Sequence, residues 1–391
     1  MPVLIAKDIV REPLYCMVPV QNAWRWKSRY KRAARAIKHY MDSGAVVYLI
    51  EIAFNRREAV FADSGIDGLP ANCGILGADS KFRHRYIGLR SLSELWLKES
   101  AINAGAARLA DLHFDWQQIC WLDADVVFVR PNWVGECIQL LQHYKFLQMF
   151  TQAQDLSPNY EMLPHGYPHS SGISFAHAWQ QGIITAEPDK RLVVRQPAPP
   201  ITPAIRQDVK QLAADLGKVV ADVAQLTHDI DYPYIAPPGM PNIFPGLATA
   251  CTRQAWDDVG GLFDIAIWGG GDYDMSHALI EQASARIHQG VHANYRLALT
   301  EWESRCRKHI RRNLGSMEGA IFHNWHGKKT QRKYVEKRQL MRKSAFDPFS
   351  HLKRDTQGLW QMHDDGSENF INFRDMMRRI AKERNEDSTD V

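Results

Sequence analysis

The chain has 391 residues, of which 45% are hydrophobic and 24% charged, and this composition excludes wholesale disorder and fibrous repeats. A formal net charge of +4 also excludes a histone-like polycation. The length predicts one large domain or two fused domains. Charged residues interrupt the N-terminal stretch where a signal peptide needs an apolar core, and no apolar run could span a bilayer. We therefore expect a cytoplasmic protein without a membrane anchor, and its six cysteines, none in a C-x-x-C pair, are expected to be buried free thiols.

Strand and helix patterns alternate up to about residue 150. In chain order they predict a strand at 14–20, a helix at 26–41, a strand at 46–54, a loop at 63–80, a helix at 93–109, a strand at 119–122, a helix at 132–144 and a strand at 146–150. This order predicts an α/β fold with a mostly parallel sheet that carries helices on both faces. Ligands of such sheets bind beyond the carboxyl ends of the strands, where Asp123 and Asp125 fall.

From 152 to 245 the alternation is lost, and Pro-rich stretches flank one strongly periodic segment. That segment predicts a long helix with a heptad seam, which packs either on its own chain or on the same helix of a second subunit in a dimer. We favour packing within the chain because so short a seam is marginal alone. The sequence then predicts a strand at 247–251, a helix at 274–283 and an acidic, frayed tail at 386–391. The apolar seam positions are Val209, Leu212, Leu216, Val219, Val223 and Leu226.

The most informative motif is Trp121-Leu-Asp-Ala-Asp-Val-Val-Phe-Val-Arg-Pro131. Two carboxylates spaced D-x-D at the end of a buried strand would repel each other, and a divalent cation between them removes that repulsion. Mg²⁺ or Mn²⁺ held in this way can also bind the oxygens of a diphosphate. The alternative is a strand-ending turn capped by aspartates. The apolar strand before the motif and the aromatic-Arg-Pro exit after it favour the metal site.

This segment resembles the D-x-D loop of GT-A-fold glycosyltransferases, which bind a nucleotide-sugar through a metal ion. The resemblance implies that Asp123 faces the ribose and the metal, and that Asp125 faces the metal itself. The upstream Trp96-Leu-Lys-Glu99 resembles the helix before this loop in soluble bacterial and phage members, which places Lys98 among the donor-binding residues. By the same resemblance, the residues from Pro19 to Asn22 neighbour the nucleotide base.

A second pair of blocks, Gly260-Gly-Leu-Phe-Asp264 and Trp268-Gly-Gly-Gly-Asp-Tyr-Asp274, agrees independently. They resemble the G-G-F-D and W-G-G-E-D-x-D blocks of galactosyltransferases and polypeptide N-acetylgalactosaminyltransferases. The resemblance implies that Gly269 and Gly270 let the backbone approach the sugar. Gly271 stands where the family carries Glu, a departure that bears on sugar and acceptor preference.

The same register places Asp272 where inverting members carry the catalytic base, and Asp274 is the second candidate. Inverting transfer needs a carboxylate that takes the proton of the acceptor hydroxyl as its oxygen attacks the anomeric carbon. The alternative is that these aspartates only cap the helix that follows.

The third block is Phe322-His-Asn-Trp-His-Gly-Lys-Lys-Thr-Gln-Arg-Lys333. In many GT-A enzymes a late histidine completes the metal shell, which makes His326 the first candidate here and His323 the second, because the glycine after His326 permits close backbone approach. The alternative is a solvated basic helix start. Three cations would neutralise the leaving diphosphate: Lys328, Lys329 and Arg332.

These motifs together indicate a metal-dependent GT-A-like glycosyltransferase with a UDP-hexose donor and an inverting mechanism. The expected parts are a nucleotide-sugar-binding half at 1–150, an insertion with the long helix at 151–245, an acceptor and catalytic half at 246–345, and a C-terminal extension at 346–391.

The acceptor is a glycan, a lipid-linked sugar or a protein, or else a hydroxymethylated pyrimidine in DNA, as for enzymes of similar fold in phages and base-J-making protozoa. Such relatives suggest a bacterial cell or a phage-infected host. A nucleotide-sugar binder or hydrolase without transfer is the alternative of another class. A pure DNA-binding module is disfavoured because neither a helix-turn-helix nor a zinc spacing is visible.

The charge is unevenly distributed along the chain. Residues 13–41 hold seven Lys or Arg and no acid, and residues 301–343 hold thirteen against four acids. The fold prediction brings both segments toward the nucleotide-sugar site, so the charge distribution indicates a polyphosphate ligand, with DNA phosphates as the alternative.

Overall fold

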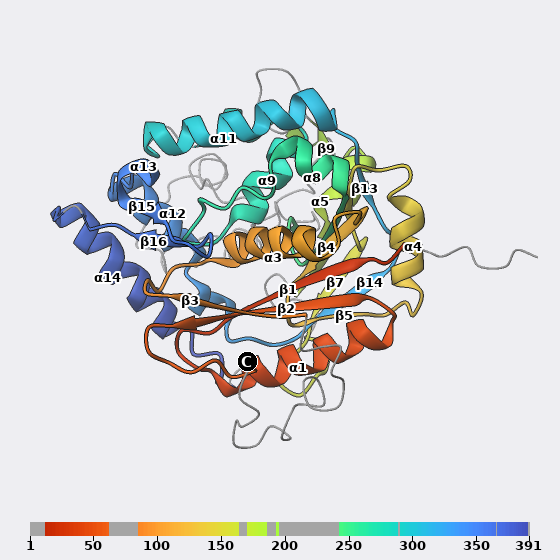
Figure 1. Ribbon diagram of the computed structural model, residues 1–391, viewed down its shortest axis with the longest axis horizontal. Helices are drawn as coiled ribbons and strands as arrows, with labels where there is room; N and C mark the ends of the chain where they lie inside the picture. The colour runs from red at the N-terminus through yellow and green to blue at the C-terminus, as the bar shows by residue number, and fades with distance from the viewer. Residues whose placement is uncertain are drawn as a thin grey trace, which may run out of the picture.

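The computed structural model describes residues 12–61, 85–163, 170–185, 193–194, 242–287, 290–364 and 366–389. The predicted loop at 63–80 and the predicted heptad helix, with the dimer it suggested, lie outside these residues. Within them the protein is mixed α/β, with a mostly parallel sheet flanked by helices, as the sequence predicts (Figure 1).

Seven strands form the larger sheet. All neighbouring pairs are parallel except those of β12, which runs antiparallel to both β4 and β6. The predicted strands are confirmed as β1, β2, β4, β6 and β12, whereas the sequence pattern misses the two edge strands, β3 and β13. In spatial order the strands are β13 (Leu314–Ser316), β6 (Phe146–Gln148), β12 (Ala248–Thr252), β4 (Gln118–Leu122), β1 (Tyr15–Gln21), β2 (Val46–Phe54) and β3 (Tyr86–Ser91).

Both faces of the larger sheet are buried. Cys16 and Val18 of β1 pack in the same apolar cluster as helix α1 (Lys27–Asp42), and Tyr15 and Met17 pack in the cluster of α3 (Lys98–Leu112). Successive side chains of a strand point to opposite faces, so a strand covered on both faces reads as a continuous apolar run. In Figure 1, α1 lies below the sheet, and α3, α8 (Arg253–Val259), α9 (Gly271–Leu279) and α11 (Ala293–Arg305) lie above it.

Two predicted helices start elsewhere than expected. The prediction began at residue 93, but α3 begins at Lys98, because the backbone amides of Trp96 and Leu97 bond to Ile267 and to the Gln21 side chain instead. The prediction also began at 274, but α9 begins at Gly271. The first turn of α9 therefore contains the two candidate acids, where negative charge complements the helix dipole.

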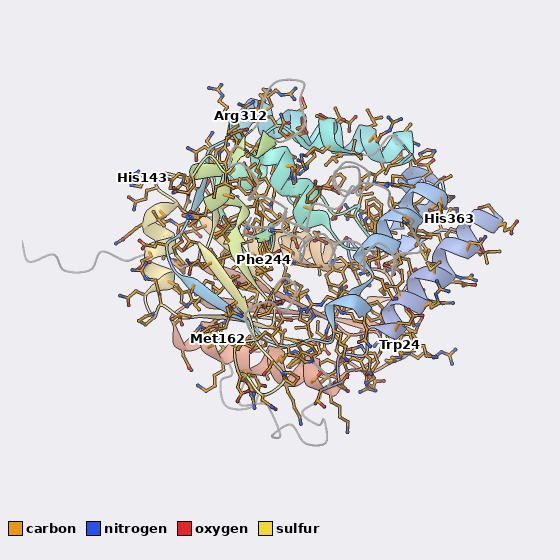
Figure 2. All side chains as sticks on the ribbon, turned by 180° about the vertical axis from the view of Figure 1, so that it is seen from behind. Trp24, His143, Met162, Phe244, Arg312 and His363 are labelled. Carbon is orange, nitrogen blue, oxygen red and sulfur yellow. The ribbon has the colours of Figure 1, made fainter. Side chains whose placement is uncertain are left out.

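A second, five-stranded sheet is the main correction, because the sequence pattern predicts no strands between 152 and 245. Its strands are short and include polar sequences such as QAQD and SGIS, so they lack the apolar run that marks a strand. Phe244 of its edge strand is labelled in Figure 2, which views the molecule from behind. The spatial order is β11 (Asn242–Phe244), β8 (Ser171–Ser174), β7 (Gln152–Asp155), β14 (Ala320–His323) and β5 (Val126–Phe128).

The remaining elements include two further two-stranded sheets, β10–β9 and β15–β16. They are α4 (Trp133–Leu140), α5 (Phe175–Gln180), β9 (Ile184–Thr185), β10 (Val193–Val194), α10 (Ala283–Arg286), the π-helical η1 (Cys306–Ile310), the 3-10 helix η2 (Lys329–Arg332), α12 (Tyr334–Lys343), α13 (Pro348–His351), β15 (Leu352–Arg354), β16 (Trp360–Met362) and α14 (Glu368–Glu383).

The chain after α14 is a further correction. The acidic composition predicts a frayed tail from 386, but Glu386 is only 1% exposed and is ion-paired with arginines. Local composition predicts fraying at an acidic end, and it could not show that buried cations lie opposite these acids.

Two smaller expectations concern cysteines and membranes. Within the described residues the five cysteines are free and buried, as predicted: Cys16, Cys120, Cys137, Cys251 and Cys306. None of the helices in the described part of the chain is long and apolar enough to cross a bilayer.

Candidate functional site

The D-x-D turn joins the two sheets. It leaves the larger sheet at the carboxyl end of β4 and enters the smaller sheet at β5. The buried hydroxyl of Tyr40, from α1, lies 2.8 Å from the carbonyl oxygens of both Asp123 and Val126. This contact ties the turn to α1, and both aspartates lie at the edge where ligands of parallel sheets bind.

Strand register brings three separate segments together at Asp125. β14 lies between β5 and β7, and its last residue, His323, pairs with Val126 on one side and with Asp155 on the other. The Nε2 atom of His323 lies 3.5 Å from Asp125 Oδ1, and its Nδ1 atom lies 2.8 Å from Asp155 Oδ1. His326 places its own Nε2 atom 3.1 Å from that of His323 and 4.0 Å from Asp125 Oδ2.

Asp125, His323 and His326 can hold one metal ion, since a ligand atom of each lies within 4.8 Å of the others. Ligands bound at about 2.0–2.2 Å to one ion lie roughly 3–4 Å apart, which matches the three distances. Asp155 contacts the far nitrogen of His323, as the orienting partner of a metal-bound imidazole usually does. Two imidazoles and one carboxylate suit Mn²⁺ or another transition metal better than Mg²⁺.

The charges of this group depend on one another. Burial opposes the protonation of His323, but Asp125 and Asp155 outweigh it and raise the pKa of His323 to about 9. Burial likewise opposes the charge of Asp125, yet His323 holds its pKa well below the usual value. Burial and then Arg332 lower the pKa of His326 well below the ordinary value. A proton on His323 thus occupies the nitrogen that a metal ion would use.

The other aspartate of the D-x-D turn faces a lysine. Lys98 is the first residue of α3 and only 5% exposed. Its Nζ atom lies 2.6 Å from Asp123 Oδ1 and 3.3 Å from both carboxylate oxygens of Asp272. Asp272 packs against Gly246, where a Cβ would come within 2.4 Å of Oδ2. Lys98 therefore holds Asp123, from the D-x-D motif, next to Asp272, from the block that begins at Trp268.

A third carboxylate, that of Glu99, lies near Lys98 and Asp272. Glu99 is 2% exposed, and its Oε1 atom has no hydrogen-bond partner among the described residues. A Cβ at Gly271 would lie 3.1 Å from that atom, so the glycine leaves room for Glu99. Burial and then the charge of Asp272 raise the pKa of Glu99 to about 8.

The glycine run before α9 makes the turn that presents Asp272. Gly269 and Gly270 have φ of +89° and +99°, values that only glycine adopts readily, and Gly269 packs on the Trp96 ring. Asp274, the second candidate base, accepts a 2.5 Å hydrogen bond from the hydroxyl of Tyr295.

Five buried or largely buried cations lie near the metal-ligand group or near one another, and we call them the cation cluster: Arg29, Arg32, Arg332, Lys337 and Arg384. Arg384 lies 2.7 Å from Nδ1 of His326. Both Arg384 and Lys337 stack over Trp96, at 5.7 and 5.8 Å from the ring centre. Burial, followed by the positive charges of Arg384 and Arg332, lowers the pKa of Lys337 to about 7.

The predicted donor-binding residues have different positions. Arg332 lies in the cation cluster, whereas Lys328 precedes η2 and the side chain of Lys329 is outside the described residues. Pro19 is buried in β1. Asn22 has a structural contact, because its side chain both accepts from the amide of Trp26 and donates to its carbonyl, each at 2.9 Å.

Several residues of this site are not identified by any pattern in the sequence. Nothing in the sequence singles out Asp155, because its strand shows no apolar pattern. Arg29 and Arg32 belong to the basic segment 13–41, which indicated a polyphosphate ligand without singling out a residue. Arg384 and Glu386 were missed because the end of the chain reads as a tail.

No family model and no curated protein match the sequence. The fold is similar to a nucleotide-diphospho-sugar transferase from Desulfovibrio desulfuricans G20, with 11% identity, a TM-score of 0.21, and 36% of this chain and 58% of that chain covered. It is also similar to a glycosyltransferase involved in the glycosylation of the major capsid of PBCV-1, with 11% identity, a TM-score of 0.19, and 59% of this chain and 81% of that chain covered. The chain thus spans little more than half of the first structure, and neither similarity assigns it to a family.

Proposed function

We propose that this protein is a metal-dependent glycosyltransferase of the GT-A type, which moves a sugar from a nucleotide-diphosphate sugar to an acceptor hydroxyl. The observation that carries the proposal is the metal-ligand group Asp125, His323 and His326 directly beside the cation cluster. A divalent cation next to several guanidinium groups complements the charge and the many oxygens of a diphosphate.

The residues fit a divalent cation, preferably Mn²⁺, by their ligand types, their mutual distances and the contact of Asp155 with His323. When bound there, such an ion would neutralise charge on the diphosphate oxygens. The chain's own arginines would also neutralise this charge, and Arg332, which is 7% exposed, is the arginine proposed for this role.

Asp272 is the group proposed to accept the proton. Its side chain is 25% exposed, so it can reach a substrate, while Lys98 contacts both of its oxygens. In the transfer, the acceptor oxygen forms a bond to the anomeric carbon and its proton passes to Asp272. The bond from that carbon to the diphosphate oxygen breaks, and the electron pair leaves with the nucleoside diphosphate. This single displacement inverts the anomeric centre.

The proposed donor is a UDP-hexose. The proposed acceptor is a hydroxyl on a glycan, a lipid-linked sugar, a protein or a hydroxymethylated pyrimidine in DNA. A gel shift separates the last from the others, because binding to duplex DNA weakens steeply with added salt. Donor loss without a glycosylated product would instead identify a hydrolase.

The test is a thermal-shift screen of nucleotide-sugars with and without Mn²⁺, on the wild type and on Asp125→Ala. A donor at 100 times its Kd adds about 2.7 kcal/mol to the free energy of unfolding, and we expect this gain only with metal. Asp125→Ala should lose the metal-dependent gain and the transfer activity but remain folded. Asp111→Ala, whose side chain is 71% exposed on α3, is the matched control and should behave like the wild type. Undiminished turnover in Asp125→Ala would refute the proposal.

A further inference from the structure

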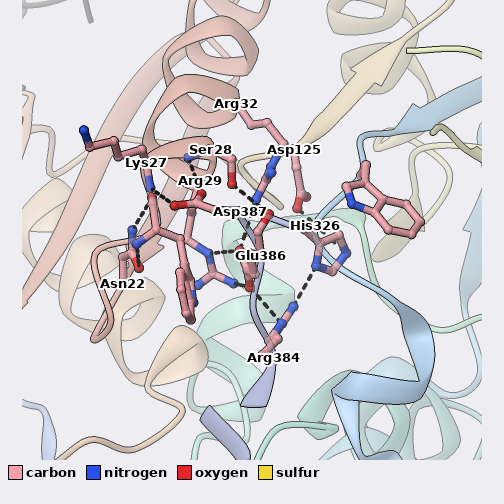
Figure 3. A network of polar contacts seen from close by, with 12 residues as sticks. Asn22, Lys27, Ser28, Arg29, Arg32, Asp125, His326, Arg384, Glu386 and Asp387 are labelled. Atoms are coloured by element: carbon pink, nitrogen blue, oxygen red, sulfur yellow. Dashed lines mark hydrogen bonds and ion pairs between the residues drawn. The ribbon is translucent and has the colours of Figure 1, made fainter. Parts of the chain in front are cut away.

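The chain after α14 inserts carboxylates into the cation cluster. We call residues 385–388 the C-terminal segment; Arg384, the C-cap residue of α14, belongs to the cation cluster. Figure 3 shows it beside the start of α1, with Glu386 among the arginines and His326 on the far side of Arg384. The segment therefore lies next to the group proposed to hold the metal ion.

Glu386 is the centre of these contacts. Its carboxylate ion-pairs with Arg29, lies 3.0 Å from Arg32 and lies 2.7 Å from Arg384. The carboxylate is 1% exposed, and the three cations surround it as they would a phosphate group. Guanidinium groups recognise carboxylate and phosphate by the same pattern of charged hydrogen bonds.

The next carboxylate, Asp387, binds at the start of α1. Its two oxygens accept the backbone amides of Lys27 and Ser28, at 3.0 and 2.8 Å. The first amides of a helix lack partners within the helix and attract anions. Two adjacent carboxylates thus occupy two adjacent anion-binding positions, one made of guanidinium groups and one of backbone amides.

The two carboxylates do not satisfy all the hydrogen-bond donors and positive charges of these anion-binding positions. Arg32 is 5% exposed, and its Nε–H donates to no acceptor among the described residues. Glu386 balances one charge, while it directly contacts three arginines. Leaving buried donors and charges unmatched is costly, so an anion with more oxygens and more charge than a carboxylate fits this place better.

We propose that Glu386 and Asp387 occupy the two phosphate positions of a diphosphate-binding site, and that a diphosphate ligand displaces the C-terminal segment. The identity of the ligand as a sugar donor rests on the function proposed above, but the competition between carboxylates and diphosphate does not. The segment then acts as an internal competitor, which leaves the site when the ligand enters.

The contact between Arg384 and His326 connects this exchange to the metal-ligand group. Arg384 lies 2.7 Å from Nδ1 of His326 and 2.7 Å from the Glu386 carboxylate, so one guanidinium group contacts both the metal-ligand group and the segment. Displacement of Glu386 by a diphosphate would therefore change a contact of the same side chain that touches His326.

The first experiment measures hydrogen–deuterium exchange of the unmodified protein with inorganic pyrophosphate and Mn²⁺ as the probe. We expect faster exchange in the peptide that covers 385–389, and retained protection at Lys27 and Ser28, whose amides would bond to pyrophosphate instead of Asp387. Unchanged exchange in that peptide at saturating pyrophosphate would overturn the proposal.

The second experiment compares pyrophosphate affinity by calorimetry in the wild type and in Glu386→Gln. A site that its own segment occupies nine-tenths of the time loses about tenfold in apparent affinity, so the variant should bind at least about tenfold more tightly. The control is Glu383→Gln, which changes a 45% exposed glutamate at the end of α14 and should keep the wild-type affinity. An unchanged or weaker affinity in Glu386→Gln would show that the segment is not a competitor.

Glu386→Gln leaves three arginines without their carboxylate, so a second variant guards against misfolding. Asp387→Asn disturbs only the contacts with two backbone amides and should give a smaller gain in the same direction. Pyrophosphate that releases the segment in a protein without sugar transfer would retain this inference and reject the proposed function. Sugar transfer from a nucleotide-sugar while the segment stays in place would reject this inference and retain the proposed function.

Discussion

Lys98 is the residue whose replacement tests the arrangement of the acids most directly. Its buried ammonium contacts Asp123 at 2.6 Å and Asp272 at 3.3 Å. Lys98→Met keeps most of the side-chain volume but leaves these acids and the neighbouring Glu99 without their cation. Removing one partner of a buried ion pair costs about 3–5 kcal/mol. Since the two aspartate side chains are 26% and 25% exposed, water relieves part of the cost, and we expect about 3 kcal/mol.

The loss of folding stability in Lys98→Met should also depend on pH. Burial raises the pKa of Asp123, while Lys98 acts in the opposite direction, so the variant raises that pKa further. An acid whose pKa is higher in the folded state than in the unfolded state binds more protons when folded, and its presence lowers the stability as pH rises through that range. Lys98→Met should therefore be less damaging at pH 5 than at pH 8.

Urea unfolding at both pH values measures these effects. The matched control is Lys38→Met, because Lys38 lies 2.7 Å from Asp42 in a pair whose side chains are 68% and 62% exposed. Such an exposed helical pair contributes about 0.3–0.5 kcal/mol. Lys98 does not stabilise these acids in this way if Lys98→Met costs no more than Lys38→Met at pH 8, or if its cost is the same at both pH values.

Two further predictions concern the metal-ligand group. The pKa of His323 is about 9 in the metal-free protein, raised from 6.5, so this proton stabilises the fold below pH 6.5 and the contribution is lost as pH passes 9. Because Mn²⁺ must displace that proton, its affinity should rise about tenfold per pH unit between 7 and 9; calorimetry would contradict this with a flat profile. Asp155→Ala removes the oxygen that contacts His323 and should weaken Mn²⁺ binding about 10–100-fold, whereas Asp155→Asn, which keeps an acceptor, should weaken it less. Equal affinities in both variants and the wild type, at unchanged circular dichroism, would refute the positioning role.

Local pattern accounts for the strands that build the centre of the larger sheet. The strands at 46–54 and 119–122 are apolar on both faces because helices cover both sides, and a doubly buried strand is visible in sequence as an apolar run. The short strands of the second sheet have no such run. Two of them, β5 and β7, pair with β14, a partner far along the chain, and the sequence of a single segment does not reveal such a partner.

In the candidate site, too, the sequence identifies the residue types while the tertiary structure decides their partners. The motifs brought Asp123, Asp125, His323 and His326 forward as one group, because carboxylates and imidazoles are the residue types that metals bind. The register of β14 between β5 and β7 decides that Asp125 faces the two histidines, and the start of α3 decides that Asp123 faces Lys98 instead. Two aspartates separated by a single residue thus have different partners.

The sequence by itself determined the α/β class, the central strands, the residue types of the candidate site and the concentration of basic residues in two segments. Each of these depends on composition or on the period of side chains within one segment, which the sequence displays directly. Only the tertiary structure decided which carboxylates those cations face, including Glu386 from a segment that composition marks as a tail. Ion pairs between residues more than 350 positions apart depend on how the chain returns to α1, and no local pattern contains that information.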